Sequence, residues 1–399
     1  MSGIAMLATV LGAAIPAATA SAAPGPAAAP ARAAAADIYI DIISKISCGS
    51  AKKCLAIGLH QNYASGADAP VAEAWNGTAW RSVTVPEPKG AMPGFTILTA
   101  VSCKSATSCL VVGNYNTAKN YLPYALTWNG TSLKPAVAPL VPKNGGGMTM
   151  DAVSCATAKS CVAIGSGGRA VETWNGAKWA VRTAAVPGSA GSLFDAPMAL
   201  SCLSATSCVW AGGTYVSANK ARTLLETWNG KAFTAMKMSA SANPNLFSVD
   251  GLSCVSAKSC VATGLGATSA SGDWTGSALV WNGKSWTGSK VSWPKGTAQS
   301  ELFGVSCTSP DSCIAVGTAG TANYVSARAE YFNGKTWTRQ TVPGPGKGKS
   351  SAFYDVSCPK AGDCVAIGEL GDFDLNTAAG TPPQVGGMWN GKTWKLARA

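Results

Sequence analysis

The chain has 399 residues, a net charge of +12 and only 13% charged residues, while glycine, alanine, serine and tryptophan are plentiful. This composition suits turns and packed strands better than long surface helices. A single histidine, His60, excludes chemistry that needs two histidines, such as a two-histidine copper site or a histidine-rich zinc site.

The N-terminus is typical of a secretory signal peptide over residues 1–23. An apolar run from Ile4 to Ile15 precedes small residues that suit a cleavage site, and the run is too short to span a membrane. No Lys or Arg precedes the run, and a buried Ala-rich helix is the alternative. An Ala/Pro-rich linker over 24–36 is predicted to lead to the mature domain, 37–399.

Fourteen cysteines form seven C-x5-C pairs with none left over. In an exported chain this spacing predicts seven local disulfides, one in each repeat. Thiolate metal sites are the alternative, but they need clustered pairs or a reducing compartment, so we predict no metal site. The predicted disulfides are Cys48–Cys54, Cys103–Cys109, Cys155–Cys161, Cys202–Cys208, Cys254–Cys260, Cys307–Cys313 and Cys358–Cys364.

The cysteine pairs mark a repeat. Six steps cover the 310 residues from Cys48 to Cys358, a mean of about 52, which is typical of propeller blades or solenoid units. Each unit contains an apolar run ending in Ser-Cys, a short turn, and a second run ending in Gly. A third run ends in an aromatic residue and Asn-Gly, and the fourth, as in Trp286 to Pro294, begins with an aromatic residue.

The Asn-Gly dipeptide predicts a hairpin between the third and fourth runs, because a type I′ turn needs positive φ at both central residues. It occurs at Asn76-Gly77, Asn129-Gly130, Asn175-Gly176, Asn229-Gly230, Asn282-Gly283, Asn333-Gly334 and Asn390-Gly391. No run has helical periodicity. The sequence therefore predicts an all-β, seven-bladed β-propeller of four-stranded antiparallel blades. A linear stack of β-units is the alternative, although it would usually have distinct capping repeats.

Over residues 40–399 the unit is similar to the kelch repeat of galactose-oxidase-type propellers, with the same order of apolar, Gly-ending and Trp-bearing strands. It differs in having mostly a single Gly and in its disulfide hairpin. The chain also resembles secreted repeat proteins of high-GC Gram-positive bacteria. The resemblance implies a propeller but no oxidase activity, because the copper ligands of galactose oxidase cannot be carried over to a chain with one histidine.

The chain begins blade one at its first strand and ends blade seven at its fourth, from Lys392 to Arg398. We therefore expect the ring to close without strand exchange. Alternatively, Asp37 to Asp41 (DIYID) supplies an extra outer strand to blade seven.

Three recurrent residue types are expected to be structural. A small serine before each first cysteine lets blades approach, whereas a nucleophilic serine would need a base and only one histidine exists. Tryptophan pairs that flank the Asn-Gly hairpin are expected to pack on each other, with sugar stacking as the alternative. Glutamates two residues before the third-run aromatic are expected to pair with Lys or Arg; they are Glu73, Glu172, Glu226 and Glu330.

A meander places its cysteine turns and Asn-Gly turns on one face of the ring, which we call the turn face. The loops between second and third strands and the blade connections form the variable face, where binding sites usually lie. The turn face is predicted to be a basic disc that either docks an anionic polymer or is merely solvated. Its lysines are Lys53, Lys104, Lys159, Lys258 and Lys360 in the cysteine turns, and Lys178, Lys231, Lys284, Lys335 and Lys392 in or beside the Asn-Gly turns.

Acids near the start of the innermost strands are expected to approach the channel mouth on the variable face. The catalytic candidates are Asp151, Asp250, Asp355, Glu301 and Tyr354. Facing carboxylates could cleave glycosides or hold Ca²⁺, although acids at this repeat position could equally cap strand ends. Ligand-binding candidates in the variable loops are His60, Tyr63, Tyr115, Tyr121, Arg169, Tyr215, Arg222, Trp274, Tyr324, Arg328, Asp372 and Asp374.

We expect a secreted or cell-surface monomer that binds a glycan or an anionic cell-envelope polymer through the variable face, with no transmembrane segment and no specific nucleic-acid partner. The sequence contains no strong catalytic motif, so a binding role is favoured over an enzyme. The alternatives are a glycoside hydrolase or lyase that uses the channel-mouth carboxylates, and an extracellular protein-interaction scaffold. No cofactor is predicted, with Ca²⁺ as the alternative.

Overall fold

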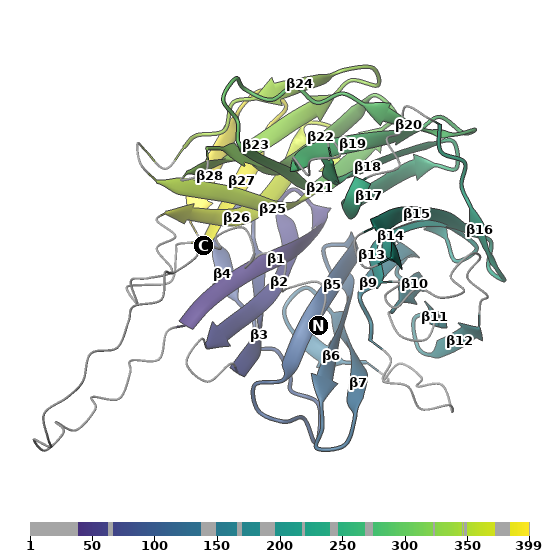
Figure 1. Cartoon of the computed structure of the whole chain (residues 1–399). Helices are drawn as coiled ribbons and strands as arrows, with labels where there is room; N and C mark the ends of the chain where they lie inside the picture. The colour runs from purple at the N-terminus through teal and green to yellow at the C-terminus, as the bar shows by residue number, and fades with distance from the viewer. Residues whose placement is uncertain are drawn as a thin grey trace, which may run out of the picture.

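The fold is a ring of seven four-stranded antiparallel sheets (Figure 1), which confirms the predicted architecture. A computed structural model describes residues 39–62, 67–136, 149–165, 170–183, 196–217, 220–239, 246–267, 274–321, 324–344, 346, 349–371 and 384–398. The predicted signal peptide and linker lie outside these residues. In the described part, no helix has the length and apolarity needed to cross a membrane.

The strands follow the repeat in chain order. Blades one to three contain β1 (Tyr39–Ser50), β2 (Lys53–Asn62), β3 (Ala67–Trp75), β4 (Trp80–Ser82), β5 (Thr96–Ser105), β6 (Ser108–Asn116), β7 (Tyr121–Trp128), β8 (Leu133–Pro135), β9 (Ala152–Thr157), β10 (Ser160–Ile164), β11 (Ala170–Trp174) and β12 (Trp179–Thr183). Blades four and five contain β13 (Ala196–Ser204), β14 (Ser207–Ser217), β15 (Lys220–Trp228), β16 (Phe233–Ala235), β17 (Leu246–Ser256), β18 (Ser259–Ala267), β19 (Trp274–Trp281) and β20 (Trp286–Ser289). Blades six and seven contain β21 (Gln299–Ser309), β22 (Ser312–Gly320), β23 (Val325–Phe332), β24 (Trp337–Gln340), β25 (Ser350–Lys360), β26 (Asp363–Gly371), β27 (Gln384–Trp389) and β28 (Trp394–Arg398).

The ring closes without strand exchange, as expected. Blade one is built from β1 to β4 and blade seven from β25 to β28, so no blade borrows a strand from the other end of the chain. The alternative for the DIYID segment is wrong where the structure describes it, because Tyr39 to Asp41 extend β1 and pair with β2. In Figure 1 the colours run once round the ring, and the last blade returns beside the first.

All seven predicted disulfides are present, and they pair the first two strands of each blade. Cys48 lies directly opposite Cys54, and the strands turn two residues beyond the first cysteine, between Ser50 and Lys53. A disulfide across so short a hairpin fixes the register of β1 against β2. Blades two to six pair their cysteines in the same way, whereas in blade seven the register shifts between Ser357 and Lys360.

The Asn-Gly hairpins are present, but the expected two-residue type I′ turn is wrong. Trp75 pairs with Trp80, which leaves a four-residue loop. The Asn76 carboxamide oxygen accepts hydrogen bonds from the amides of Thr78 and Ala79 at 2.8 and 2.9 Å, and Gly77 takes a φ of 99°. The asparagine side chain thus replaces a backbone acceptor inside the turn, and only the glycine needs positive φ.

Adjacent blades are joined by a recurrent hydrogen bond. The amide of each first cysteine donates to the hydroxyl of the serine that precedes the first cysteine of the neighbouring blade. The seven bonds, at 2.8–3.0 Å, are Cys103 to Ser47, Cys155 to Ser102, Cys202 to Ser154, Cys254 to Ser201, Cys307 to Ser253, Cys358 to Ser306 and Cys48 to Ser357. The recurrent serine is therefore structural, and it forms a closed ring of hydrogen bonds around the channel.

The recurrent tryptophan pairs form the blade cores. Trp174 and Trp179 are 5.2 Å apart between ring centroids, and both rings are buried. Third-strand indoles also bond the cysteine turn of their own blade, as when Trp281 donates to the Ala257 carbonyl at 3.0 Å. These contacts join the two hairpins of a blade and leave little ring surface for sugar stacking.

Replacing Ser357 by alanine should lower the free energy of unfolding by about 1–3 kcal/mol, because the Cys48 amide loses its acceptor at the ring closure. Ser154→Ala, inside the ring, should cost about the same. Ser82→Ala, at an exposed site in β4, should change stability by less than about 0.5 kcal/mol. Urea unfolding with intact disulfides measures the stability of all three variants. A loss of stability in Ser154→Ala without one in Ser357→Ala would contradict the view that the closing junction is equivalent to the others.

Candidate functional site

The central channel contains a cavity of about 120 Å³ that is lined by the first strands of all seven blades. Its lining residues are Lys45, Thr99, Ala100, Val101, Asp151, Ala152, Val153, Ala199, Leu200, Asp250, Gly251, Leu252, Val305 and Asp355. The structure therefore brings together three of the predicted acids, and it adds a lysine that the sequence reasoning did not select.

A β-bulge in the first strand helps to form this lining. The register of β5 shifts at Thr99 and that of β17 shifts at Asp250, so each strand carries one extra residue four positions before its cysteine. Bulges re-aim a side chain, and here both extra residues line the cavity. The glycine that ends each second run has a matching role: a Cβ on Gly264 would lie 2.1 Å from the Ser248 carbonyl oxygen of the bulged strand.

Asp250 and Glu301 form a hydrogen-bonded carboxyl pair between blades five and six. Burial raises the pKa of Asp250 to about 6, opposed by the Lys45 charge and by hydrogen bonds from Ser248 and Glu301. Burial and the neighbouring Asp250 charge raise the pKa of Glu301 to about 8. Two adjacent carboxyls cannot easily both ionise, so the pair shares one proton near neutral pH.

Hydroxyl groups orient two of the channel acids in the same way. Ser248 donates to Asp250 at 3.1 Å, and Thr149 donates to Asp151 at 2.8 Å. In both cases the hydroxyl lies two residues before the acid. Tyr121 lies near Asp151. Burial, and then the charge of that aspartate, raise the pKa of the tyrosine to about 12. Asp151, before the first strand of blade three, and Tyr121, in blade two, thus form a polar pair of which Asp151 lines the cavity.

Asp355 is held differently. Its two carboxylate oxygens accept from the amides of Ile46 at 2.9 Å and Val356 at 2.8 Å, which ties blade seven to blade one. Burial raises its pKa, while Lys45 and the two backbone hydrogen bonds lower it. Asp355 therefore lines the cavity and also hydrogen-bonds strand amides, which is close to the strand-capping role given as the alternative for these acids.

Tyr354 faces its own blade more than the cavity. It is buried next to Glu369, and burial followed by the charge of that carboxylate raises its pKa well above the usual value. Its ring also lies edge-on to Phe303, with centroids 5.9 Å apart. These contacts make it a packing residue next to the channel acids.

The recurrent glutamates of the third strands are largely buried, with varied partners. Glu330 pairs with Arg328 at 2.6 Å, as expected, and Glu226 accepts a hydrogen bond from the Trp210 indole at 3.0 Å. Glu172 is fully buried and Glu73 is half-buried. All four residues thus share a buried or half-buried position in the third strand.

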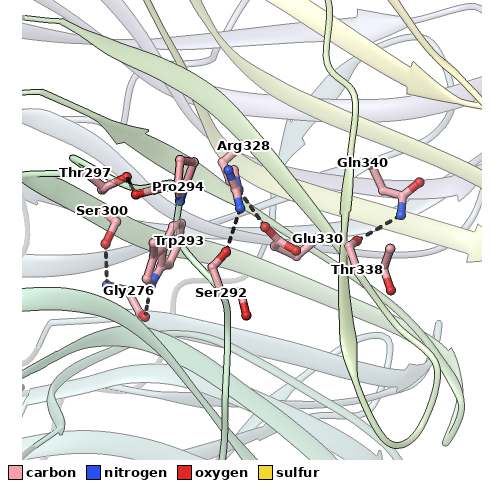
Figure 2. Close-up of polar contacts among 10 residues, drawn as sticks. All are labelled: Gly276, Ser292, Trp293, Pro294, Thr297, Ser300, Arg328, Glu330, Thr338 and Gln340. Carbon is pink, nitrogen blue, oxygen red and sulfur yellow. Dashed lines mark hydrogen bonds and ion pairs between the residues drawn. The ribbon is translucent and has the colours of Figure 1, made fainter.

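Arg328, a candidate ligand residue, is committed to the interior (Figure 2). It is 4% exposed, donates to the Ser292 carbonyl at 2.9 Å, and lies 5.1 Å from the ring centroid of Trp293. Trp293 in turn donates to the Gly276 carbonyl at 3.1 Å, so this cluster joins blades five and six. The geometry gives Arg328 a packing role.

The other loop candidates are dispersed. His60 is half-buried in β2, Tyr115 packs edge-on to Tyr124 at 6.1 Å, and Tyr324 is 53% exposed. Tyr63, Arg169, Asp372 and Asp374 lie outside the described residues. Tyr215, Arg222 and Trp274 belong to β14, β15 and β19, but their side chains are not part of the description.

The absence of a metal site stays a prediction, and Ca²⁺ at the channel mouth stays its alternative. Within the described residues, no three His, Cys, Asp or Glu side chains are grouped so that they could hold a metal ion. The Ca²⁺ alternative therefore gains no support from this part of the chain.

Comparison with known proteins identifies the fold class. The chain matches the β-propeller domain of the Trilobed protease from Pyrococcus furiosus, which has an open velcro topology, with a TM-score of 0.50 and 7% identity over 90% of this chain and 95% of that one. It also matches the GH74 xyloglucanase from Xanthomonas campestris (TM-score 0.52, 12% identity, 88% and 58% covered) and an acylaminoacyl peptidase from Pyrococcus horikoshii (0.50, 8%, 90% and 52%). No protein-family model and no curated protein matches the sequence. At these identities the likeness shows the seven-bladed propeller fold and nothing more.

Glu301→Gln should make stability less dependent on pH. Both carboxyl pKa values are raised on folding, so the stabilisation from the bound proton is complete below about pH 4 and is lost as the pH rises through about 8. Glutamine keeps a donor for Asp250 without titrating, so the variant should exceed the wild type by on the order of 1 kcal/mol at pH 8 and by less at pH 5.

Unfolding midpoints from pH 5 to pH 9 measure this difference. Asp311→Asn, on an exposed turn, is the control and should follow the wild-type profile. Parallel curves for wild type and Glu301→Gln would contradict a shared proton.

Arg328→Met should destabilise the protein by about 3–5 kcal/mol, because it leaves the Glu330 carboxylate buried without its cation. Adding Glu330→Gln should recover part of the loss, and neither variant should change ligand binding once folded. Thermal unfolding of the single and double variants tests the coupling, and strictly additive losses would contradict it.

Proposed function

We propose that this chain is a secreted binding protein that recognises a glycan or cell-envelope polymer through the variable face of the propeller, at the channel mouth. The observation that carries the proposal is the cavity in which Asp151, Asp250 and Lys45 meet. Oriented carboxylates accept hydrogen bonds from sugar hydroxyls, and a nearby ammonium donates to ring and hydroxyl oxygens. The disulfide in every blade suits an extracellular scaffold.

The carboxyl geometry favours binding over hydrolysis. Glycosidases keep their two carboxyl groups about 5–5.5 Å apart when they retain configuration, or about 6.5–9.5 Å when they invert. Asp250 and Glu301 instead share a hydrogen bond, which brings their carboxyl groups closer together than either of these separations. The pair is better suited to accepting hydrogen bonds than to flanking a scissile bond.

A carbohydrate-active enzyme is the second candidate, because the raised pKa of Glu301 would suit a general acid near neutral pH. An extracellular protein-interaction scaffold is the third. The proposal also includes a kelch-type repeat and an export signal, both of which are supported by the sequence alone.

Asp151→Asn and Asp250→Asn should each weaken polysaccharide retention by about tenfold, through lost charge-assisted hydrogen bonds. The measurement is retention of the purified chain on neutral and anionic polysaccharides, together with release of reducing or unsaturated ends. Asp311→Asn, on the turn face, is the matched control and should be retained on neutral polysaccharides as the wild type is.

The outcomes separate the three candidates. Product release that Asp250→Asn abolishes would overturn the binding proposal in favour of the enzyme. Retention without product, reduced only in the channel variants, supports it. A protein captured without competition by any saccharide would favour the scaffold.

A further inference from the structure

The turn face carries most of the net charge of the protein. Eleven lysines and two aspartates lie in its cysteine and Asn-Gly turns, a net charge of +9 out of +12 for the whole chain. The lysines, all exposed, are Lys52, Lys53, Lys104, Lys159, Lys178, Lys231, Lys258, Lys284, Lys335, Lys360 and Lys392. The aspartates are Asp311 and Asp363, and Asp363 pairs with Lys360 at 2.9 Å.

The two turns of each blade touch, which brings their lysines together. A Cβ on the Asn-Gly glycine would meet the cysteine turn of the same blade in all seven repeats. In blade three a Cβ on Gly176 would lie 2.8 Å from the side-chain stem of Lys159, and Lys178 follows two residues later. Blade five repeats it with Lys258, which lies against Gly283, one residue before Lys284. Rigid turns thus hold like charges side by side, an arrangement that a bound polyanion would stabilise.

We propose that the turn face docks a linear phosphodiester polymer that carries no nucleobases, independently of the channel-mouth site. Lysine ammonium groups are point charges and lack the bidentate geometry with which arginine recognises a phosphate or a base. An array of them therefore suits regularly spaced, singly charged phosphates. A phosphodiester chain carries one charge in every repeat, and binding it gains from the release of condensed counterions. The adjacent tryptophans are held by contacts within the blades, so they provide no platform for stacking nucleobases.

A lipid bilayer fits this face less well. Stable attachment to a membrane usually combines basic residues with inserted apolar groups or a lipid anchor. The exposed large apolar side chains of the described residues are Met92, Phe95, Leu203 and Tyr324. Of these, only Leu203 lies in a cysteine turn, and one partly exposed side chain is too little apolar surface for stable insertion.

The test compares two quadruple variants with the same net charge. The face variant changes Lys159, Lys178, Lys258 and Lys284 to Gln. The control variant changes Lys89, Lys119, Lys237 and Lys295 to Gln; these are also exposed but lie outside the cysteine and Asn-Gly turns. The probe is labelled poly(glycerol phosphate), and its affinity for the full chain is measured by fluorescence anisotropy at 50 and 200 mM salt.

The wild type should bind with an affinity that falls steeply with salt. The face variant should lose about tenfold or more at low salt, with a salt slope shallower by up to about 3, while the control stays within about twofold of the wild type. The proposal would be overturned if the wild type did not bind, if the face variant lost no affinity, or if both variants lost the same affinity. Tighter binding to phosphatidylglycerol vesicles or to single-stranded DNA would also overturn it. Asp250→Asn should bind the polymer normally, so failure here and failure at the channel are distinguishable.

Discussion

The hydrogen bond between a cysteine amide and the serine hydroxyl of the neighbouring blade is the contact on which the ring depends. The same cysteine is tied to its own second strand by a disulfide, so one residue fixes both the register within a blade and the position between blades. At the closure, Cys48 and Ser357 meet at 3.0 Å, within the range of the six other junctions, and Asp355 adds a bond to Ile46. The ring therefore closes through the same contact that builds it, and strand exchange is unnecessary.

The fold could be predicted because its determinants are local and repeated. Cysteine spacing, a glycine after the second run and an Asn-Gly dipeptide each specify a turn or a strand end within a few residues. The type I′ prediction failed because the sequence does not reveal that the Asn76 side chain fills the hydrogen-bonding role within a longer loop. In the same way, the small serine was identified as a packing residue, but its acceptor role depends on how far one blade is rotated from the next.

The site was less predictable because it is assembled from different blades. Asp250 and Glu301 were both candidates, yet their shared proton depends on the bulge in β17 and on the angle between blades five and six. Lys45 was overlooked because a lysine on an inner strand looks unremarkable in one repeat. Alignment on the cysteine is the signal that could have found it, since the residue three positions before the first cysteine is glycine or alanine in five of the seven blades.

The repeats of the chain separate scaffold from specificity. The residue immediately before the first cysteine is serine in all seven blades, because every junction needs the same acceptor. The residue four positions before it differs in almost every blade; the seven are Ser44, Thr99, Asp151, Met198, Asp250, Phe303 and Tyr354. Three of these residues, Thr99, Asp151 and Asp250, line the cavity, whereas Phe303 and Tyr354 pack on each other, so the position has no common structural role. Because the junctions between blades are alike, variation at this position can make the lining of the channel asymmetric, with Asp151 and Asp250 in blades three and five, while the cysteine and Asn-Gly turns stay similar from blade to blade.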